Sequence, residues 1–164
     1  MLVDAPHLTS VSFVDLPDSE PLPQTGAIIV SLARFLKERE AFLARTEPLG
    51  VRMQTGESPE SLAAEVQHLA LIVLQVPYFK DGRAFSWARL LRTRLNYRGE
   101  LRVAGHVLRD QIAFYARVGV DSFELPHALT PAEVEAARSE ISHVYQPSVD
   151  GQVTIRELRA MRTS

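Results

Sequence analysis

Cysteine is absent from this chain of 164 residues. Without it the polypeptide forms no disulfide, has no thiolate nucleophile, and supplies no cysteine ligand to a zinc ribbon or an iron–sulfur cluster. Any redox role would therefore depend on a non-covalently bound cofactor or on a metal centre in a partner protein.

A strong excess of one charge and a long apolar run are also missing. The formal net charge is −2, which argues against general nucleic-acid binding, since that requires a basic excess spread along a surface. The amino-terminal sequence does not read as a secretion signal, and no apolar run approaches the ~20 residues that a membrane-spanning helix needs. We therefore expect a cytoplasmic protein that binds neither nucleic acid nor membranes.

The motifs of common enzyme classes are lacking too. No GxGxxG follows an expected strand, and the chain has neither a GxxxxGK[ST] phosphate loop nor a GxSxG nucleophile turn. The histidines have no His or Glu partner at metal-binding spacing, so we predict no metal site. A flavin phosphate held at a plain helix amino terminus is still compatible with the sequence.

The composition is that of one ordinary globular domain, with 46% hydrophobic and 23% charged residues. Residues 1–26 are rich in proline and read as a loosely attached lead-in with a possible edge strand at residues 10–14. Residues 27–146 have the pattern of a folded domain. Residues 147–164 form a polar tail, which we expect to be a frayed helix or an arm.

Helical and extended segments alternate within this domain. The most apolar run, residues 69–79, has no polar alternation and is typical of a strand buried on both faces. Further strands are expected at residues 100–104, 121–125 and 142–145, and helices at 33–44, 58–69, 84–96, 107–117 and 131–139. The alternation predicts an α/β fold, a single and mainly parallel sheet with crossover helices on both faces.

Seven arginines and three glycines stand within residues 79–111. Two loops of this segment follow the carboxyl ends of expected strands, and in an open parallel sheet such ends meet at one edge, where ligands bind. A glycine before the next helix lets a ligand approach the free N–H groups of that helix, which favour an anion. We therefore predict an anion- or cofactor-binding site at this edge. Its candidate residues are Asp81, Gly82, Arg83, Ser86, Arg89, Arg92, Arg102, Gly105, Arg109 and Asp110.

A structural explanation of the same residues stays open. Arg89 and Arg92 are equally consistent with a solvated helix face whose cations pair with nearby acids. Asp81 is also consistent with a loop acid that fixes the turn or holds Arg83. Gly105 is the more suggestive glycine, because a strand end without a side chain leaves room for a ligand.

The stretch VPYFKDGRAFSWARLLRTRLNYRGELRVAGHVLRDQ, continued by YARVGVDSFEL, closely resembles the bacterial family catalogued as domain of unknown function 934 (DUF934). The likeness covers residues 69–125 well and the segment from residue 27 more weakly. Members of this family are described as oxidoreductases involved in sulfite reduction, because their genes lie beside sulfite reductase and other sulfate-assimilation genes. The resemblance thus implies a role in sulfur assimilation, with sulfite reductase or another enzyme of that pathway as the candidate partner.

Three interpretations follow. In the first, the protein is an accessory protein of assimilatory sulfate or sulfite reduction that binds a small oxyanion or an acidic partner through the Arg/Gly-rich edge. In the second, it is an oxidoreductase that holds a flavin or another phosphorylated cofactor on the same edge. In the third, it is an interaction module whose arginines make only internal ion pairs. The sequence identifies no cofactor and leaves open whether a reaction is catalysed.

Overall fold

The computed structural model describes residues 2–3, 11–126, 129–141 and 143–162. Its strands form one seven-stranded sheet in the order β1-β7-β6-β5-β4-β3-β2. The strands are β1 (Leu2–Val3), β2 (Val14–Asp15), β3 (Ile28–Ser31), β4 (Leu49–Met53), β5 (Leu71–Val76), β6 (Glu100–Gly105) and β7 (Ser122–Glu124). The α-helices are α1 (Leu32–Lys37), α2 (Arg39–Leu43), α3 (Arg83–Thr93), α4 (Gln111–Arg117), α5 (Pro131–Arg138) and α6 (Ile155–Arg162), with 3-10 turns η1 (Pro59–Leu62) and η2 (Val66–His68).

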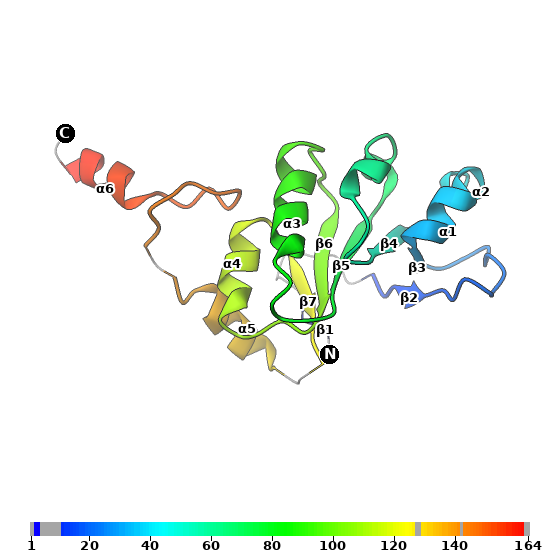
Figure 1. Ribbon diagram of the computed structural model, residues 1–164, viewed down its shortest axis with the longest axis horizontal. Coiled ribbons are helices and arrows are strands. Elements are labelled where there is room, and N and C mark those ends of the chain that lie inside the picture. The colour runs from blue at the N-terminus through cyan, green and yellow to red at the C-terminus, as the bar shows by residue number, and fades with distance from the viewer. Residues whose placement is uncertain (1, 4–10, 127–128, 142, 163–164) are drawn as a thin grey trace.

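Strand order and chain order coincide from β2 to β7, and each of these strands pairs in parallel with the next. Every crossover therefore moves in the same direction across the sheet, and right-handed crossovers that do so place their helices on one face. Figure 1 shows α4, α3 and α1 in a row that follows the strand order. The predicted α/β class and the mainly parallel sheet are confirmed, but the helices cover one face instead of both.

Burial separates the two faces of the sheet. Side chains from α1, α3, α4 and α5 share one large core with Ile72, Leu74 and Val76 of β5. The opposite face has a smaller core in which Leu71 and Val73 of β5 are buried, with Phe13 of the lead-in packed against it. Both faces of β5 are thus buried, as its apolar run predicts, although described helices contribute to only one of the two cores.

β4 is a strand that the sequence pattern does not indicate, because its five residues include a glycine and an arginine. It forms because it pairs in parallel with β3 on one side and β5 on the other. Gly50 suits this position, since a Cβ there would lie 3.1 Å from the side chain of Ile29 and 3.2 Å from that of Leu71.

Two further expectations differ from the structure. The helix expected at residues 58–69 begins as predicted, with Ser58 as N-cap and Pro59 at the first position, but it consists of the two 3-10 turns η1 and η2. Both turns lie in the connection between β4 and β5, residues 54–70, and 3-10 helices are used in such short pieces because their hydrogen-bond geometry is poorer than that of an α-helix. The strand expected at residues 142–145 is reduced to one bridge between Val144 and Thr154, and Ser142 lies outside the described residues.

The described part of the lead-in, residues 11–26, is held firmly by the domain instead of being loosely attached. Buried Arg34 of α1 donates hydrogen bonds to the carbonyl oxygens of Pro17 (2.8 Å) and Glu20 (2.7 Å). The possible edge strand at residues 10–14 overlaps the observed strand β2 only at Val14, because residues 11–13 are not in a strand and Ser10 lies outside the described residues.

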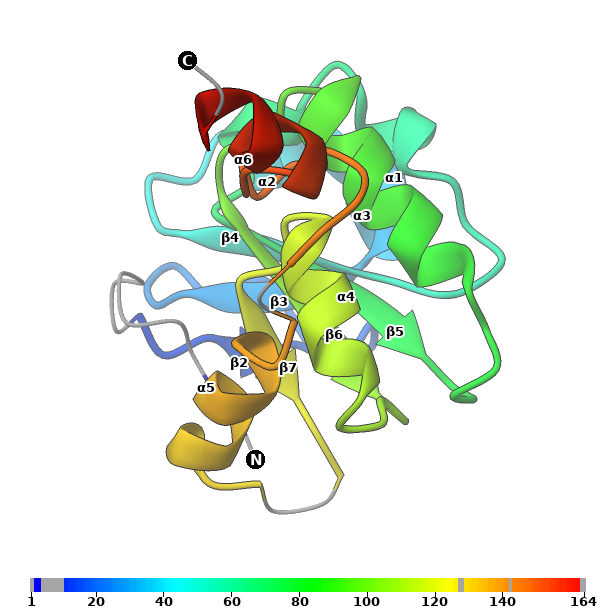
Figure 2. The ribbon, with the colours of Figure 1, turned by 90° about the vertical axis from the view of Figure 1, so that its left-hand side faces the viewer.

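The carboxyl-terminal segment forms an arm that ends in α6 and extends beyond α4 and α5 in Figure 1. In Figure 2 the same arm lies on the side nearest to the viewer. Within the residues that the structure describes, no helix is long and apolar enough to cross a membrane.

Candidate functional site at the carboxyl edge of the sheet

The two loops singled out in the sequence lie at the same edge of the sheet. β5 and β6 are parallel neighbours in which Val76 is aligned with Gly105, so both chains leave the sheet at the same level. Gln111 ties the loops together, because its Nε2 donates to the carbonyl oxygen of Phe79 (2.9 Å) and its Oε1 accepts from the backbone N–H of Leu108 (3.1 Å). We refer to residues 77–83 and 105–111 together as the rim.

Gly105 is required at the rim by the backbone itself. Its φ angle is +108°, which side-chain-bearing residues rarely adopt, and a Cβ would lie 2.3 Å from the carbonyl oxygen of Val76. The space beside Gly105 is therefore occupied by the neighbouring strand end. Gly82 has no such constraint, since a Cβ there would meet nothing within 4 Å.

Asp81 and Arg83 form a closed pair at the start of α3. One carboxylate oxygen of Asp81 accepts from Nε of Arg83 (2.9 Å) and from its backbone N–H (3.1 Å), and the other accepts from Nη2 (2.8 Å). These hydrogen bonds hold the pKa of Asp81 below its usual value. The carboxylate thus already occupies the position in which an oxyanion would contact both the helix amino terminus and the guanidinium group.

The other predicted residues of α3 lie at increasing distances from the rim. Ser86 and Arg89 are exposed along the outer side of the helix. Arg92 lies at the far end of α3, near the amino edge of the sheet, where it donates to the carbonyl oxygens of Tyr97 (2.8 Å) and Gly99 (2.9 Å). It also bonds to the carbonyl oxygen of Gly119 and to the carboxylate of Asp121. Arg92 therefore fastens several chain segments together at the edge opposite the rim.

Arg102, Arg109 and Asp110 also take different places. Arg102 is buried on the sheet face without helices, where it binds Glu100 (2.7 Å) and Ser122 (3.2 Å). Arg109 and Asp110 are exposed on the rim just before α4, and Arg109 pairs with Glu140 at 3.0 Å. The structure thus brings six of the ten predicted residues together on the rim and places Arg92 and Arg102 elsewhere.

Sequence reasoning missed the most conspicuous property of the rim, which is its exposed apolar surface. Tyr78, Phe79 and Leu108 on the rim and Phe114 on the adjoining face of α4 are between 45% and 73% exposed. In the sequence, only the adjacent aromatic residues Tyr78 and Phe79 in the turn PYFKDGR indicate this surface. Taken singly, Phe79 reads as the end of a strand, and Leu108 and Phe114 read as residues on the core face of a helix. Aromatic side chains exposed beside cations are typical of protein-binding surfaces.

The second missed residue is Arg52 of β4, on the sheet face without helices. Its guanidinium group binds both carboxylate oxygens of Asp15 (3.0 and 2.9 Å), the side-chain oxygen of Gln75 (3.1 Å) and the carboxylate of Glu124 (3.2 Å). Burial acts to lower the pKa of Arg52, but the hydrogen bonds and charges of Asp15 and Glu124 together outweigh it and the net change in pKa is upward. Because Asp15 lies in β2 and Glu124 in β7, this one side chain connects strands far apart in the sheet order.

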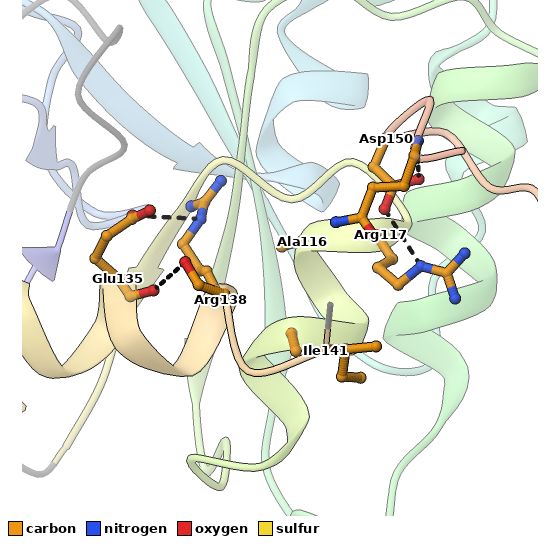
Figure 3. Close-up of a pocket in the computed structure, with 9 residues that line it drawn as sticks. Ala116, Arg117, Glu135, Arg138, Ile141 and Asp150 are labelled. Carbon is orange, nitrogen blue, oxygen red and sulfur yellow. Dashed lines mark hydrogen bonds and ion pairs between the residues drawn. The ribbon is translucent and has the colours of Figure 1, made fainter. Parts of the chain in front are cut away.

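A cavity of about 410 Å³ lies away from the rim, between α4, α5 and the turn at residues 150–152. Figure 3 shows that its two arginines lie on opposite sides and point away from one another, Arg117 toward Asp150 and Arg138 beside Glu135. Each cation is thus beside a carboxylate, and the two do not converge on one anion. Elsewhere in the described ranges, no three His, Asp or Glu side chains are grouped so that they could hold a metal ion.

A family model described as "Bacterial protein of unknown function (DUF934)" matches residues 50–156. The chain belongs to this family. The matched region runs from β4 into α6 and includes the whole rim, Arg52 and most of the carboxyl-terminal arm. No curated protein and no solved structure matches the chain significantly.

Proposed function

We propose that this DUF934 protein is an accessory protein of assimilatory sulfate or sulfite reduction that binds an acidic partner or an oxyanion through the rim. The connection to sulfur assimilation rests on the description of family members given above. The binding role rests on one observation, the joining of the two rim loops at the carboxyl edge by Gln111, with apolar and cationic side chains exposed on both.

The contacts of the rim favour a protein partner over a small oxyanion. Arg83 and Arg109 are each engaged with a carboxylate of the same chain, so a free anion would have to displace Asp81 or Glu140. A protein partner gains binding energy from burying Tyr78 and Phe79 as well, and large aromatic side chains supply most of the affinity at such interfaces. An acidic edge on the partner would then pair with the exposed cations around them.

The test is binding of the purified protein to the assimilatory sulfite reductase of the same organism. We expect Phe79→Ala and Arg83→Glu each to weaken binding by about tenfold or more, since central aromatic and arginine contacts dominate interface energies. Arg94→Glu is the matched control, because it makes the same charge change just after α3 but at the opposite end of the helix. Equal losses for Arg83→Glu and Arg94→Glu would show a general charge effect instead of a rim site.

A parallel titration with sodium sulfite separates the two kinds of ligand. If sulfite binds and Arg83→Ala and Arg89→Ala both weaken it, the oxyanion is the ligand of the rim. If the reductase binds and sulfite does not, the partner protein is the ligand of the rim. If neither binds to the wild-type protein, the proposed function is wrong.

A further inference from the structure

The basic side chains of this protein are concentrated in the middle of the chain. Residues 79–104 carry seven basic and two acidic side chains, whereas residues 1–78 carry five basic and ten acidic ones and residues 105–164 carry six and eight. Of these three parts, only the one that contains α3 has a basic excess, in a chain whose formal net charge is −2. A concentration of one charge on a protein of the opposite sign favours contact with a partner of complementary charge.

Most of these cations lie on the surface around α3. Arg92 and Arg102 are turned inward, with side chains that are 11% and 6% exposed, in the ion pairs described above. The other cations of the segment are exposed, and they are Lys80, Arg83, Arg89, Arg94 and Arg98. Both acids of the segment are largely shielded, since the side chains of Asp81 and Glu100 are each 11% exposed. The outer surface around α3 is therefore mainly basic.

Arg89 is a cation of α3 that lacks a compensating carboxylate. On a helix the neighbours of a residue stand three and four positions away, and none of these positions is acidic for Arg89. They are occupied by Phe85, Ser86, Arg92 and Thr93. Within the part of the chain that the structure describes, Arg83 pairs with Asp81 and Arg94 with Glu60, but no carboxylate pairs with Arg89. Its guanidinium group is therefore available to a carboxylate from outside.

Arg89 lies on one side of α3 together with Arg83, Ser86 and Thr93. These residues are spaced three or four positions apart, so they follow one another along the helix, and all four are exposed. We refer to them as the α3 strip. At about 1.5 Å per residue, the strip extends about 15 Å from Arg83 on the rim toward the other end of α3 (Figure 1). The strip thus continues the rim along the outside of the domain.

The charge of the remaining chain selects the kind of partner. Outside residues 79–104 the protein has eighteen acidic and eleven basic side chains, which repel a long polyanion such as a nucleic acid. A protein with a local acidic segment meets the α3 strip without facing the rest of this charge. Such a partner also buries Phe79, which is 46% exposed where the strip begins.

We propose that the α3 strip binds an acidic segment of the same partner protein that contacts the rim, with Arg89 pairing with a carboxylate of that partner. Arg89 is suited to this contact because it breaks no internal ion pair, whereas Arg83 has to leave Asp81. This inference rests on the proposed function and adds to it the chemistry of the recognised surface and its direction along α3. Complementary charges of this kind fix the orientation of two proteins and speed their association.

The first experiment measures binding of the full chain to purified assimilatory sulfite reductase of the same organism. We expect Arg89→Glu to weaken binding by about tenfold at low ionic strength, and the loss to become smaller as salt screens the charges. Arg94→Glu is the matched control, because it makes the same charge change five residues further on, at a side chain that is tied to Glu60 outside the strip. Its expected effect is below about twofold.

Ser86 allows a test in which binding and stability respond differently. Ser86→Glu places a carboxylate between Arg83 and Arg89, where it neutralises the strip and also forms favourable pairs within the helix. We therefore expect the free energy of unfolding in urea to be unchanged or slightly raised, while binding weakens by about fivefold to tenfold. Ser86→Gln has nearly the same shape without the charge and should bind within about twofold of the wild type.

The outcomes separate this inference from the proposed function. Weaker binding of the rim variant Phe79→Ala and of both charged strip variants supports both. If Phe79→Ala weakens binding while Arg89→Glu binds like Arg94→Glu, the strip is not part of the site and the proposed function stands. The same conclusion follows if Ser86→Glu binds like Ser86→Gln. A wild-type protein that does not bind the reductase overturns both.

A single-stranded oligonucleotide is the second probe. We expect it to bind the wild-type protein at least about tenfold more weakly than the reductase does. If it binds more tightly than the reductase, and Arg89→Glu removes that binding, the strip is a nucleic-acid site and the inference is wrong.

Discussion

Replacing Arg92 by glutamine tests whether this arginine stabilises the fold. In the sequence it reads as a ligand contact, because it lies in the arginine-rich motif. In the structure its guanidinium group donates to three main-chain carbonyl oxygens and to Asp121, and its side chain is 11% exposed. Glutamine is too short to reach these acceptors together, so the substitution leaves several buried oxygens and one carboxylate without the cation.

The expected loss follows from these contacts. Removing one partner of a largely buried ion pair costs about 3–5 kcal/mol, because the Asp121 carboxylate loses its cation while it stays mostly buried beside the backbone N–H of Leu101. The carbonyl contacts are part of the same network and are not added on top, since interactions within one network are not independent. We therefore expect the free energy of unfolding to fall by about 3–5 kcal/mol, which for a chain of this size lowers the melting temperature by roughly 6–20 °C.

Urea unfolding followed by the fluorescence of Trp87, the single tryptophan of the chain, measures this change. The matched control is Arg89→Gln, one turn earlier on the exposed side of α3, which we expect to change stability by less than about 0.5 kcal/mol. A loss below about 1 kcal/mol for Arg92→Gln, or similar losses for the two variants, would refute the assignment of Arg92 to the fold.

Three further predictions concern the rim and the sheet. The carboxyl carbon of Asp81 should titrate by NMR with a midpoint below the ordinary pKa of 3.8, so that the Arg83 contact is intact above that pH and is lost as the pH falls through the lowered pKa. Arg83→Gln should raise the midpoint toward the ordinary value, because the guanidinium group is lost while the backbone N–H of residue 83 still donates to Asp81. Gly105→Ala should lower the free energy of unfolding by about 2–4 kcal/mol, through its positive φ and the contact with the neighbouring strand, whereas Gly82→Ala should change it by less than about 1 kcal/mol. Arg52→Met should lower the free energy of unfolding by about 1–3 kcal/mol, because two carboxylates in distant strands lose their common cation. An unchanged free energy of unfolding in urea would contradict the bridging role of Arg52.

Much of the architecture is accessible from local pattern. The apolar run around β5 predicts a strand buried on both faces, and the helical periodicity after Gly82 predicts α3, because both signals lie within one continuous segment. The parallel sheet follows from the alternation of such segments. The shared edge of the two rim loops follows in turn from parallel pairing, without knowledge of the strand order beyond the adjacency of β5 and β6.

Other features depend on which segments become neighbours. Arg83, Arg92 and Arg102 look alike in the sequence, yet the first lies on the rim, the second closes the amino edge and the third is buried on the face without helices. β4 forms because two strands flank it, and Arg52 gains its role because the sheet brings Asp15 and Glu124 within its reach.

The sequence by itself therefore determined the fold class, the buried central strand and the edge at which the motif loops meet, since each depends on local periodicity and chain direction. Only the tertiary structure decided that α1, α3, α4 and α5 cover one face, which arginines hold the fold together, and that Gln111 joins the two rim loops where Phe79 and Leu108 are exposed. Burial and pairing depend on the residues that fold against a side chain from distant parts of the chain, and no local pattern contains that information.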